Sequence, residues 1–119
     1  MLNRKNRIGN RQVIEKLYQK GSLLKDHFLV FKYEKTDSPS QFAITVSKKI
    51  SKKAIVRNQI KRRLREKVRI ELPRLKKGID GVIIVRPGVV KEKNQEISKN
   101  LNKIFLRAKL IRKNGSSNF

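Results

Sequence analysis

The side chains best placed to do chemistry in this sequence are cations gathered between Ser47 and Arg69. The stretch reads SKKISKKAIVRNQIKRRLREKVR, and acids are rare in it. Lys and Arg at this density bind anions, and the planar guanidinium of Arg fits the oxygens of a phosphate. The residues expected to contact such an anion are Lys48, Lys49, Lys52, Lys53, Arg57, Asn58, Lys61, Arg62, Arg65 and Arg69.

A helical wheel separates this stretch into two faces. At about 100° per residue, apolar side chains fall on one side and polar ones on the other. The apolar row is Val56, Ile60, Leu64 and Val68, and the polar row is Asn58, Arg62, Arg65 and Arg69. A solvated face held by salt bridges is the alternative interpretation, but it needs acids. Only Glu66 and Glu71 are available in this helix, so the row favours binding to a polyanion.

Groups that could catalyse hydrolysis are sparse. An enzyme that hydrolyses with its own side chains needs a His pair for acid and base work, or carboxylates that hold two metal ions. The chain has one His, His27, without a positioned partner, and its acids show no Asp-x-Asp pattern. It also has no cysteine for a thiolate metal site. The sequence therefore predicts no catalytic residue and no metal site in the protein itself.

The elements that must position the basic stretch follow from periodicity and turn residues. A first helix carries Val13, Ile14, Leu17 and Tyr18, with Asn10 as its N-cap and Gly21 at its end. The runs 27–33 and 41–47 predict two strands that pair as an antiparallel hairpin. A helix capped by Ser51 extends to about Leu72, a strand covers 82–86, and a last helix shows the stripe Ile97, Leu101, Ile104, Phe105 and Ala108.

The order helix, strands, helix, strand, helix predicts an α+β fold, a single-domain α/β sandwich with one small, mainly antiparallel sheet. Residues 1–113 are expected to form one domain with a basic N-terminal arm of Arg4, Lys5 and Arg7, and residues 114–119 a disordered tail. The chain carries 32 Lys and Arg against 9 Asp and Glu, a formal charge of +23. Such a charge indicates a nucleic-acid partner. Neither a secretory signal nor a run long enough for a membrane helix is visible, so a cytoplasmic protein without a membrane partner is expected.

The segment SKKISKKAIVRNQIKRRLRE resembles the signature of the bacterial ribonuclease P protein subunit. In that family a Ser-Lys-Lys strand end leads into a helix with Arg-Asn-Arg and then Lys-Arg. Arg57, Asn58, Lys61, Arg62 and Arg65 fit those positions, whereas Gln59 stands where the family usually has Arg. The order of the other elements also agrees, over roughly Arg4 to Ile111.

The resemblance implies a subunit of the ribonucleoprotein that removes the 5′ leader from precursor tRNA. The RNA subunit is expected to perform the chemistry with bound Mg²⁺, while the protein binds that RNA and the leader, with no obligate protein partner. An unusual left-handed strand-helix-strand crossover is also implied.

The family places a cleft for the leader between the first helix and the sheet, at positions matched here by Ile14, Tyr18 and Phe31. Aromatic rings can stack on bases of single-stranded RNA. If Phe31 faces this cleft, strand alternation assigns Phe28, Val30, Phe42, Ile44 and Val46 to the opposite, buried face. The alternative is that the three cleft residues belong to the core, since an i, i+4 apolar pair usually packs.

Two other functions share the size and charge of this chain. A ribosomal or ribosome-associated RNA-binding protein would also lack catalytic groups. A DNA-binding factor would place the basic helix in a major groove, but strands rather than a helix-turn-helix precede this helix. The Ser-Lys-Lys to Arg-Asn segment and the aromatic first helix favour the ribonuclease P subunit over both.

Overall fold

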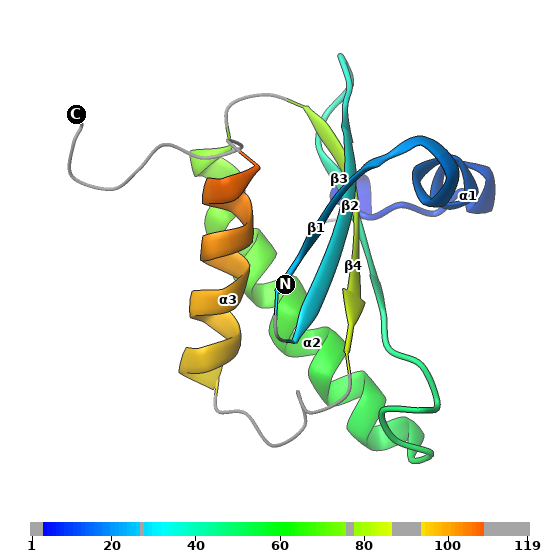
Figure 1. The fold of residues 1–119 in the computed structure, drawn as a ribbon, viewed down its shortest axis with the longest axis vertical. Helices are drawn as coiled ribbons and strands as arrows, with labels where there is room; N and C mark the ends of the chain where they lie inside the picture. Colours follow the sequence, from blue (N-terminus) through cyan, green and yellow to red (C-terminus); the bar gives the residue numbers. More distant parts are fainter. Residues whose placement is uncertain (1–3, 27, 76–77, 87–93, 109–119) are drawn as a thin grey trace.

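The computed structural model describes residues 4–26, 28–75, 78–86 and 94–108, with side chains in the last range from residue 99 onward. Four strands form one sheet that helices cover on both faces (Figure 1). This arrangement confirms the expected α+β fold. The elements are η1 (Arg4–Asn6), α1 (Arg11–Lys20), β1 (Ser22–Lys25), β2 (Leu29–Lys35), β3 (Gln41–Thr45), α2 (Ala54–Glu71), η2 (Leu72–Arg74), β4 (Ile79–Val85) and α3 (Asn94–Arg107). The predicted tail 114–119 lies outside the described residues.

The strand order corrects the predicted hairpin. The sheet runs β1-β2-β4-β3, so β2 and β3 do not pair, and β4 lies between them. β4 is antiparallel to β2 and parallel to β3, and the actual hairpin joins β2 to the short strand β1. The sequence of β4, IDGVIIV, is apolar over most of its length, which is typical of a central strand buried on both faces. This apolar run indicates that β4 is a central strand, which agrees with its position between β2 and β3. The turn residues 36–40 indicate only that the chain changes direction between β2 and β3.

Gly81 explains how β4 fits between two aromatic strands. It is paired with Tyr33 of β2 and with Phe42 of β3. A Cβ atom on Gly81 would lie 2.5 Å from the Phe31 ring and 3.3 Å from the Phe42 ring. The missing side chain therefore leaves room for the two rings, whose centroids are 6.4 Å apart.

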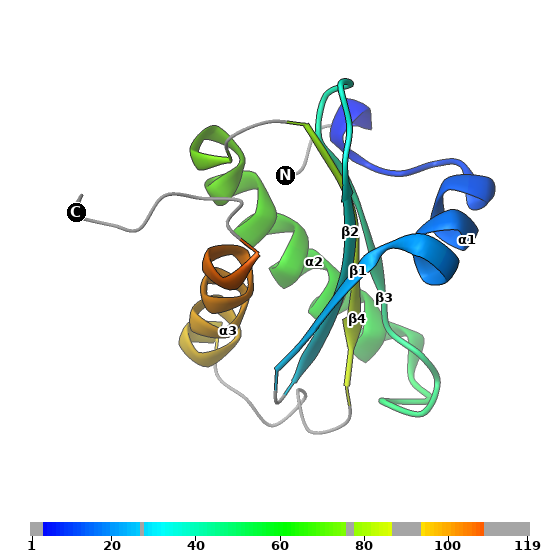
Figure 2. The same cartoon turned by 45° about the horizontal axis from the view of Figure 1, so that its top comes forward.

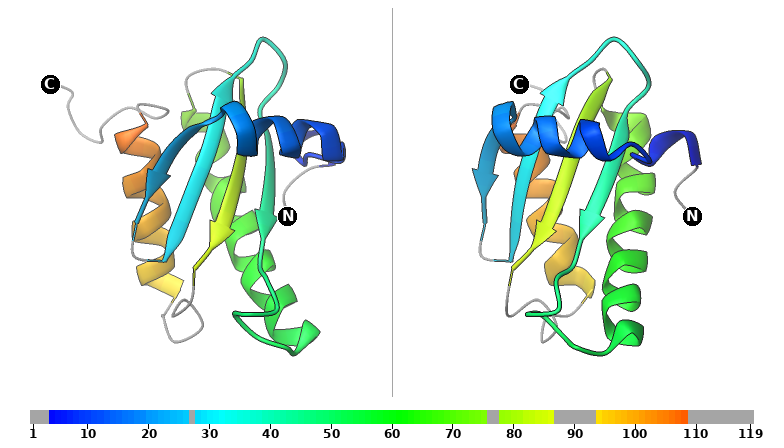
Figure 3. Two further views of the ribbon diagram at one scale, coloured as in Figure 1. Left: turned by 45° about the vertical axis from the view of Figure 1, so that its right-hand side comes forward. Right: turned by 90° about the vertical axis from the view of Figure 1, so that its right-hand side faces the viewer.

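The connection from β3 through α2 to β4 is the crossover that the family resemblance implies. β3 and β4 are neighbouring parallel strands, and α2 joins them. In the right-hand view of Figure 3 both strands point down, α2 lies behind the sheet, and β4 is to the left of β3. This geometry is left-handed, whereas almost all such crossovers are right-handed.

Two layers of helix enclose the sheet. α2 and α3 cover one face, and α1 crosses the other (Figures 1 and 2). The main core lies under α2 and α3, where Phe31, Phe42 and Phe105 meet with ring centroids 5.5 to 6.4 Å apart. The predicted apolar rows supply this core: Ile60, Leu64 and Val68 from α2, and Leu101, Ile104, Phe105 and Ala108 from α3, are all buried.

The observed helix caps agree with the predicted ones at α1 but not at α2. The side chain of Asn10 accepts a hydrogen bond of 2.8 Å from the amide of Gln12, and Gly21 follows α1, as predicted. Ser51 does not cap α2, which begins at Ala54 after Lys53. Instead, the Ser51 hydroxyl accepts a bond from the Lys53 amide and holds a local turn. Such a turn competes with the cap for the same hydroxyl.

Candidate RNA-binding surfaces

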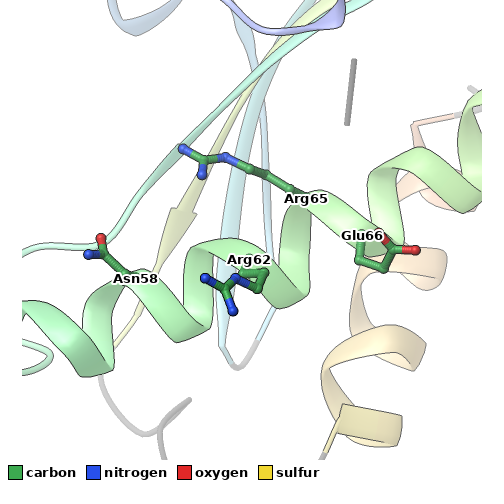
Figure 4. A pocket seen from close by; sticks show the side chains of 4 residues that line it. All are labelled: Asn58, Arg62, Arg65 and Glu66. Atoms are coloured by element: carbon green, nitrogen blue, oxygen red, sulfur yellow. The ribbon is translucent and has the colours of Figure 1, made fainter. Parts of the chain in front are cut away.

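The polar row of α2 forms an open cationic surface. Asn58, Arg62, Arg65 and Glu66 line a surface hollow along the helix. Figure 4 shows the guanidiniums of Arg62 and Arg65 extending toward the Asn58 end, while the Glu66 carboxylate points away from them. Neither arginine forms an ion pair with any residue that the structure describes. Both are therefore available to an external phosphate.

Glu66 and Arg69 form a pair at the far end of this row. The Arg69 Nε lies 3.0 Å from the Glu66 Oε1. The hydrogen bond from Arg69 lowers the pKa of Glu66 to about 2, so the carboxylate stays charged at every physiological pH. Arg69, predicted as a free phosphate contact, is thus held by an internal partner. The strongest phosphate contacts are expected at Arg62 and Arg65.

The loop before α2 carries the four predicted lysines. Lys48, Lys49, Lys52 and Lys53 are all exposed, and the hydroxyls of Ser47 and Ser51 accept hydrogen bonds from backbone amides in the loop. Arg57 is half-buried, and its Nη1 donates a 2.9 Å bond to the Ser51 carbonyl. Part of the Arg57 guanidinium therefore fixes the loop that presents the lysines. Lys61 is half-buried on α2.

The N-terminal arm lies along the outer edge of β3. The Ile8 amide donates to the Phe42 carbonyl over 3.0 Å, and the Asn6 side-chain amide donates to the Ser40 carbonyl over 2.8 Å. Arg4 and Lys5 are exposed and Arg7 is half-buried. The arm and α2 both lie at the β3 side of the molecule (Figure 3). The arm also covers backbone groups that an open strand edge would expose.

The structure corrects the predicted leader cleft. Phe31 is 0% exposed and packs edge to face on Phe105 of α3, so it faces the core under α2 and α3. Tyr18 belongs to α1 on the opposite face of the sheet and is 39% exposed. The two rings therefore cannot line one surface. Ile14 is half-buried on α1.

The structure corrects the face predicted for Val30 on β2. Phe31 and Phe42 share the core face, so Val30 points to the α1 side with its partner Ile84. Phe42 and Val46 are buried, and Phe28 and Ile44 pack partly against the same core, so their burial is as predicted, but Phe31 belongs to this core and does not lie on an opposite face. The predicted face of Val30 is wrong because it depends on a cleft position for Phe31, which lies in the core. Directly paired residues of neighbouring strands lie on the same face of the sheet, and the sequence alone does not reveal which residues are paired.

Lys32 lies on the face of the sheet that α1 covers, and no sequence motif pointed to it. Its Nζ donates to the Tyr18 carbonyl in the last turn of α1, and it lies 5.5 Å from the centroid of the Tyr18 ring. A cation is favourable at a helix C-terminus and over an aromatic face. Lys32 therefore links α1 to the sheet and orients the exposed ring of Tyr18.

Replacing Lys32 with Met should loosen α1. Loss of the helix-end cation and of the ring contact is expected to lower Tm by roughly 3–8 °C. Thermal unfolding followed by circular dichroism measures this, and Lys35→Met, on the same strand but exposed, is the matched control. Equal shifts for the two variants would contradict the linking role of Lys32.

Two carboxylates also face α1. Glu34 and Asp80 are cross-strand partners on β2 and β4, and the Lys16 Nζ of α1 lies 3.7 Å from the Glu34 Oε1. Burial raises the pKa of Asp80, the neighbouring Glu34 charge adds to the rise, and Lys16 opposes it. The ionised form of Asp80 is therefore disfavoured in the folded protein.

Asp80→Asn should stabilise the protein at neutral pH. The raised pKa means that ionised Asp80 costs folding free energy above its titration range, and the cost disappears below its ordinary pKa. A rise in Tm of about 1–2 °C at pH 7 is expected, since solvent screens a partly exposed carboxylate, and none near pH 3. Asp37→Asn in an exposed loop is the control. A gain that is the same at both pH values would show that ionisation is not its cause.

Comparison with known proteins identifies the fold and its family. The family model described as Ribonuclease P matches residues 2–109. The chain belongs to the ribonuclease P protein family. The ribonuclease P protein component of Rippkaea orientalis is 34% identical over 112 residues, covering 89% of this chain and 88% of that protein. The component of Microcystis aeruginosa is 41% identical over 73 residues, 61% of each chain.

A solved structure agrees with the topology. A mutant of the Staphylococcus aureus RNase P protein superposes with a TM-score of 0.82 at 25% identity, covering 89% of this chain and 90% of that one. Membership in the ribonuclease P family confirms the resemblance drawn from the basic segment. The chain is thus a protein subunit of the tRNA-processing ribonucleoprotein ribonuclease P, which also contains an RNA subunit. The ribosomal and DNA-binding alternatives are set aside.

Three further features of the sequence are Gln59, His27 and the lack of a predicted membrane span. Gln59, which replaces the usual family Arg, is exposed on α2 next to Asn58, so the substitution removes a charge without removing the polar surface. His27 lies outside the described residues. No described helix is long and apolar enough to cross a membrane.

Proposed function

We propose that this ribonuclease P protein binds the catalytic RNA through α2 and the arm, and the 5′ leader of precursor tRNA through the α1 side of the sheet. The observation that carries the first part is the row of Asn58, Arg62 and Arg65, which is open and has no ion pair to either arginine among the described residues. Arg62 is exposed and Arg65 is half-buried, and arginines in a row suit successive phosphates of a folded RNA. The lysines of the preceding loop would extend this contact.

The leader surface that we propose differs from the one expected from the sequence. It consists of Ile14 and Tyr18 on α1 with Lys32, Val30 and Ile84 on the sheet, without Phe31. Val30, Lys32 and Ile84 are half-buried, so each has surface left for a ligand. A ring beside a cation is a suitable platform for single-stranded RNA, because every base can stack and every nucleotide carries a phosphate.

The chemistry is proposed to reside in the RNA. Among the described residues, no group of three or more His, Cys, Asp or Glu side chains gathers where a metal ion could bind. The described residues therefore offer no cluster suited to a Mg²⁺ site, and we propose that Mg²⁺ is bound mainly by the RNA subunit and the substrate. The protein would lower the Mg²⁺ requirement by neutralising phosphates where the two RNAs meet. A cytoplasmic location and independence from other proteins stay predictions.

Cleavage of precursor tRNA tests the proposal. The protein alone should leave precursor tRNA intact, and its addition to a cognate catalytic RNA should lower the Mg²⁺ concentration needed for half-maximal cleavage. Mature tRNA and cut leader are separated on a denaturing gel. Site-specific cleavage by RNA-free protein, or an unchanged Mg²⁺ requirement, would overturn the proposed division of labour.

A further inference from the structure

The turn between β1 and β2 is held by two arginines that the proposed function does not use. Arg107, at the end of α3, donates from Nη1 to the Lys25 carbonyl over 2.9 Å. Arg86, directly after β4, donates from Nη1 to the Asp26 carbonyl over 2.9 Å. Both side chains remain exposed. Each guanidinium has five N–H donors, so most of them are left for another acceptor.

Arg107 is the last member of a basic row on α3. Lys99, Lys103 and Arg107 are spaced by four residues and are all exposed. This spacing puts them on one side of the helix, with a rise of about 6 Å between neighbours. Residues 99–108, whose side chains the structure describes, contain no acid. Within residues 99–108 this row therefore has no acidic neighbour on its own helix that could pair with it.

This surface is separate from the α2 surface. α3 packs beside β1 and β2, and α2 packs beside β3. The strand order puts β1 and β3 at opposite edges of the sheet. Figure 1 shows α3 on the β1 side of α2. The described ion pairs also lie elsewhere, at Arg11, Lys16, Arg69 and Arg74.

We propose that Arg86, Lys99, Lys103 and Arg107 form a second RNA-binding surface, the β1-edge surface, which contacts a phosphate backbone that α2 does not reach. The main-chain carbonyls fix the two guanidiniums in advance, which lowers the ordering cost of binding. Regularly spaced cations without base-reading partners suit a backbone rather than a base sequence. The partner is RNA of the ribonuclease P complex, either its RNA subunit or the precursor tRNA, and in this the inference rests on the proposed function.

The test removes two charges without disturbing the turn. Lys99→Gln/Lys103→Gln retains good helix formers at exposed positions, so Tm should stay unchanged. Lys20→Gln/Lys35→Gln removes the same two charges from exposed positions on α1 and β2 and is the matched control. Dissociation constants are measured over a KCl series, first for the RNA subunit and then for precursor tRNA on the assembled holoenzyme.

The variant of the β1-edge surface should bind one of the two RNAs about 3- to 30-fold more weakly, with the salt slope reduced by roughly 0.7–0.9 for each lost contact. The affected RNA identifies the source of the phosphates. Affinities and slopes equal to those of the control pair for both RNAs would overturn the inference. If the wild-type protein itself bound neither RNA, the proposed function would fail instead.

A single cysteine can locate the contact, because the chain contains none. Lys103→Cys carrying an iron chelate should cleave RNA by local hydroxyl radicals in a segment different from that cut from Asn58→Cys. Cleavage of the same nucleotides from both positions would contradict two separate surfaces, and no cleavage above background from position 103 would contradict RNA binding at the β1 edge.

Discussion

Phe31→Ala is expected to lower the free energy of unfolding by roughly 3–5 kcal/mol. The Phe31 ring is fully buried and lies within 6.4 Å of the rings of Tyr33, Phe42 and Phe105, measured between centroids. Its removal would leave a cavity at the centre of the sheet, beside Gly81, which has no side chain to fill the space. Such a loss is a large part of the 5–15 kcal/mol that stabilises a typical domain. Urea denaturation followed by circular dichroism measures it.

Tyr18→Ala is the informative partner of this variant. Tyr18 is exposed on α1, and its replacement removes the ring contact with Lys32 but keeps the backbone carbonyl to which Lys32 donates, so the midpoint of urea unfolding should fall much less than in Phe31→Ala. It should weaken binding of precursor tRNA to the holoenzyme without affecting mature tRNA, since one stacked base is worth about 1–3 kcal/mol. Phe31→Ala should reduce binding of both tRNA forms together. A stable Phe31→Ala protein that lost only leader binding would show that the ring reaches the RNA after all.

Arg62→Ala/Arg65→Ala is expected to weaken binding to the RNA subunit by about 10- to 100-fold at moderate salt. Both guanidiniums extend from α2 without an ion pair among the described residues, so their loss removes phosphate contacts and leaves the core intact. Each lost contact should reduce the slope of log affinity against log salt by roughly 0.7–0.9. Filter binding over a KCl series gives both quantities.

Arg11→Ala/Arg74→Ala is the matched control for charge. Each of these arginines pairs with a neighbouring glutamate, at 3.6 Å for Arg11 and Glu15 and at 3.0 Å for Arg74 and Glu71. Their removal changes net charge equally but should take away no phosphate contact. Reduced affinity with an unchanged salt slope in the Arg62 and Arg65 variant would contradict direct phosphate binding.

The basic surface of α2 was predictable because one helix carries it. The spacing of Ile60, Leu64 and Val68 decides which side is buried, and Asn58, Arg62 and Arg65 then face outward without knowledge of the rest of the fold. For Arg69, the sequence indicates only that an acid, Glu66, lies three positions earlier on the same helix. The geometry of their pairing needed the actual side-chain positions.

The α1 side of the sheet was not predictable in the same way, because several distant segments build it. The face on which Phe31 lies depends on its strand partners and on Phe105, more than seventy positions later. The expected hairpin failed for the same reason. Local turn residues can suggest that two strands are neighbours, but only the apolar run of β4 accounts for a third strand between them.

The position of β4 also has a consequence for synthesis on the ribosome. β2 and β3 each pair with β4 and not with each other, and β4 follows both of them and the whole of α2 in the chain. A nascent chain that has not yet released β4 can form the β1–β2 hairpin, but it leaves an unpaired edge on β2 and no sheet partner for β3. Closure of the sheet must therefore wait for late, non-local pairing, which is slow and leaves apolar strands open to aggregation.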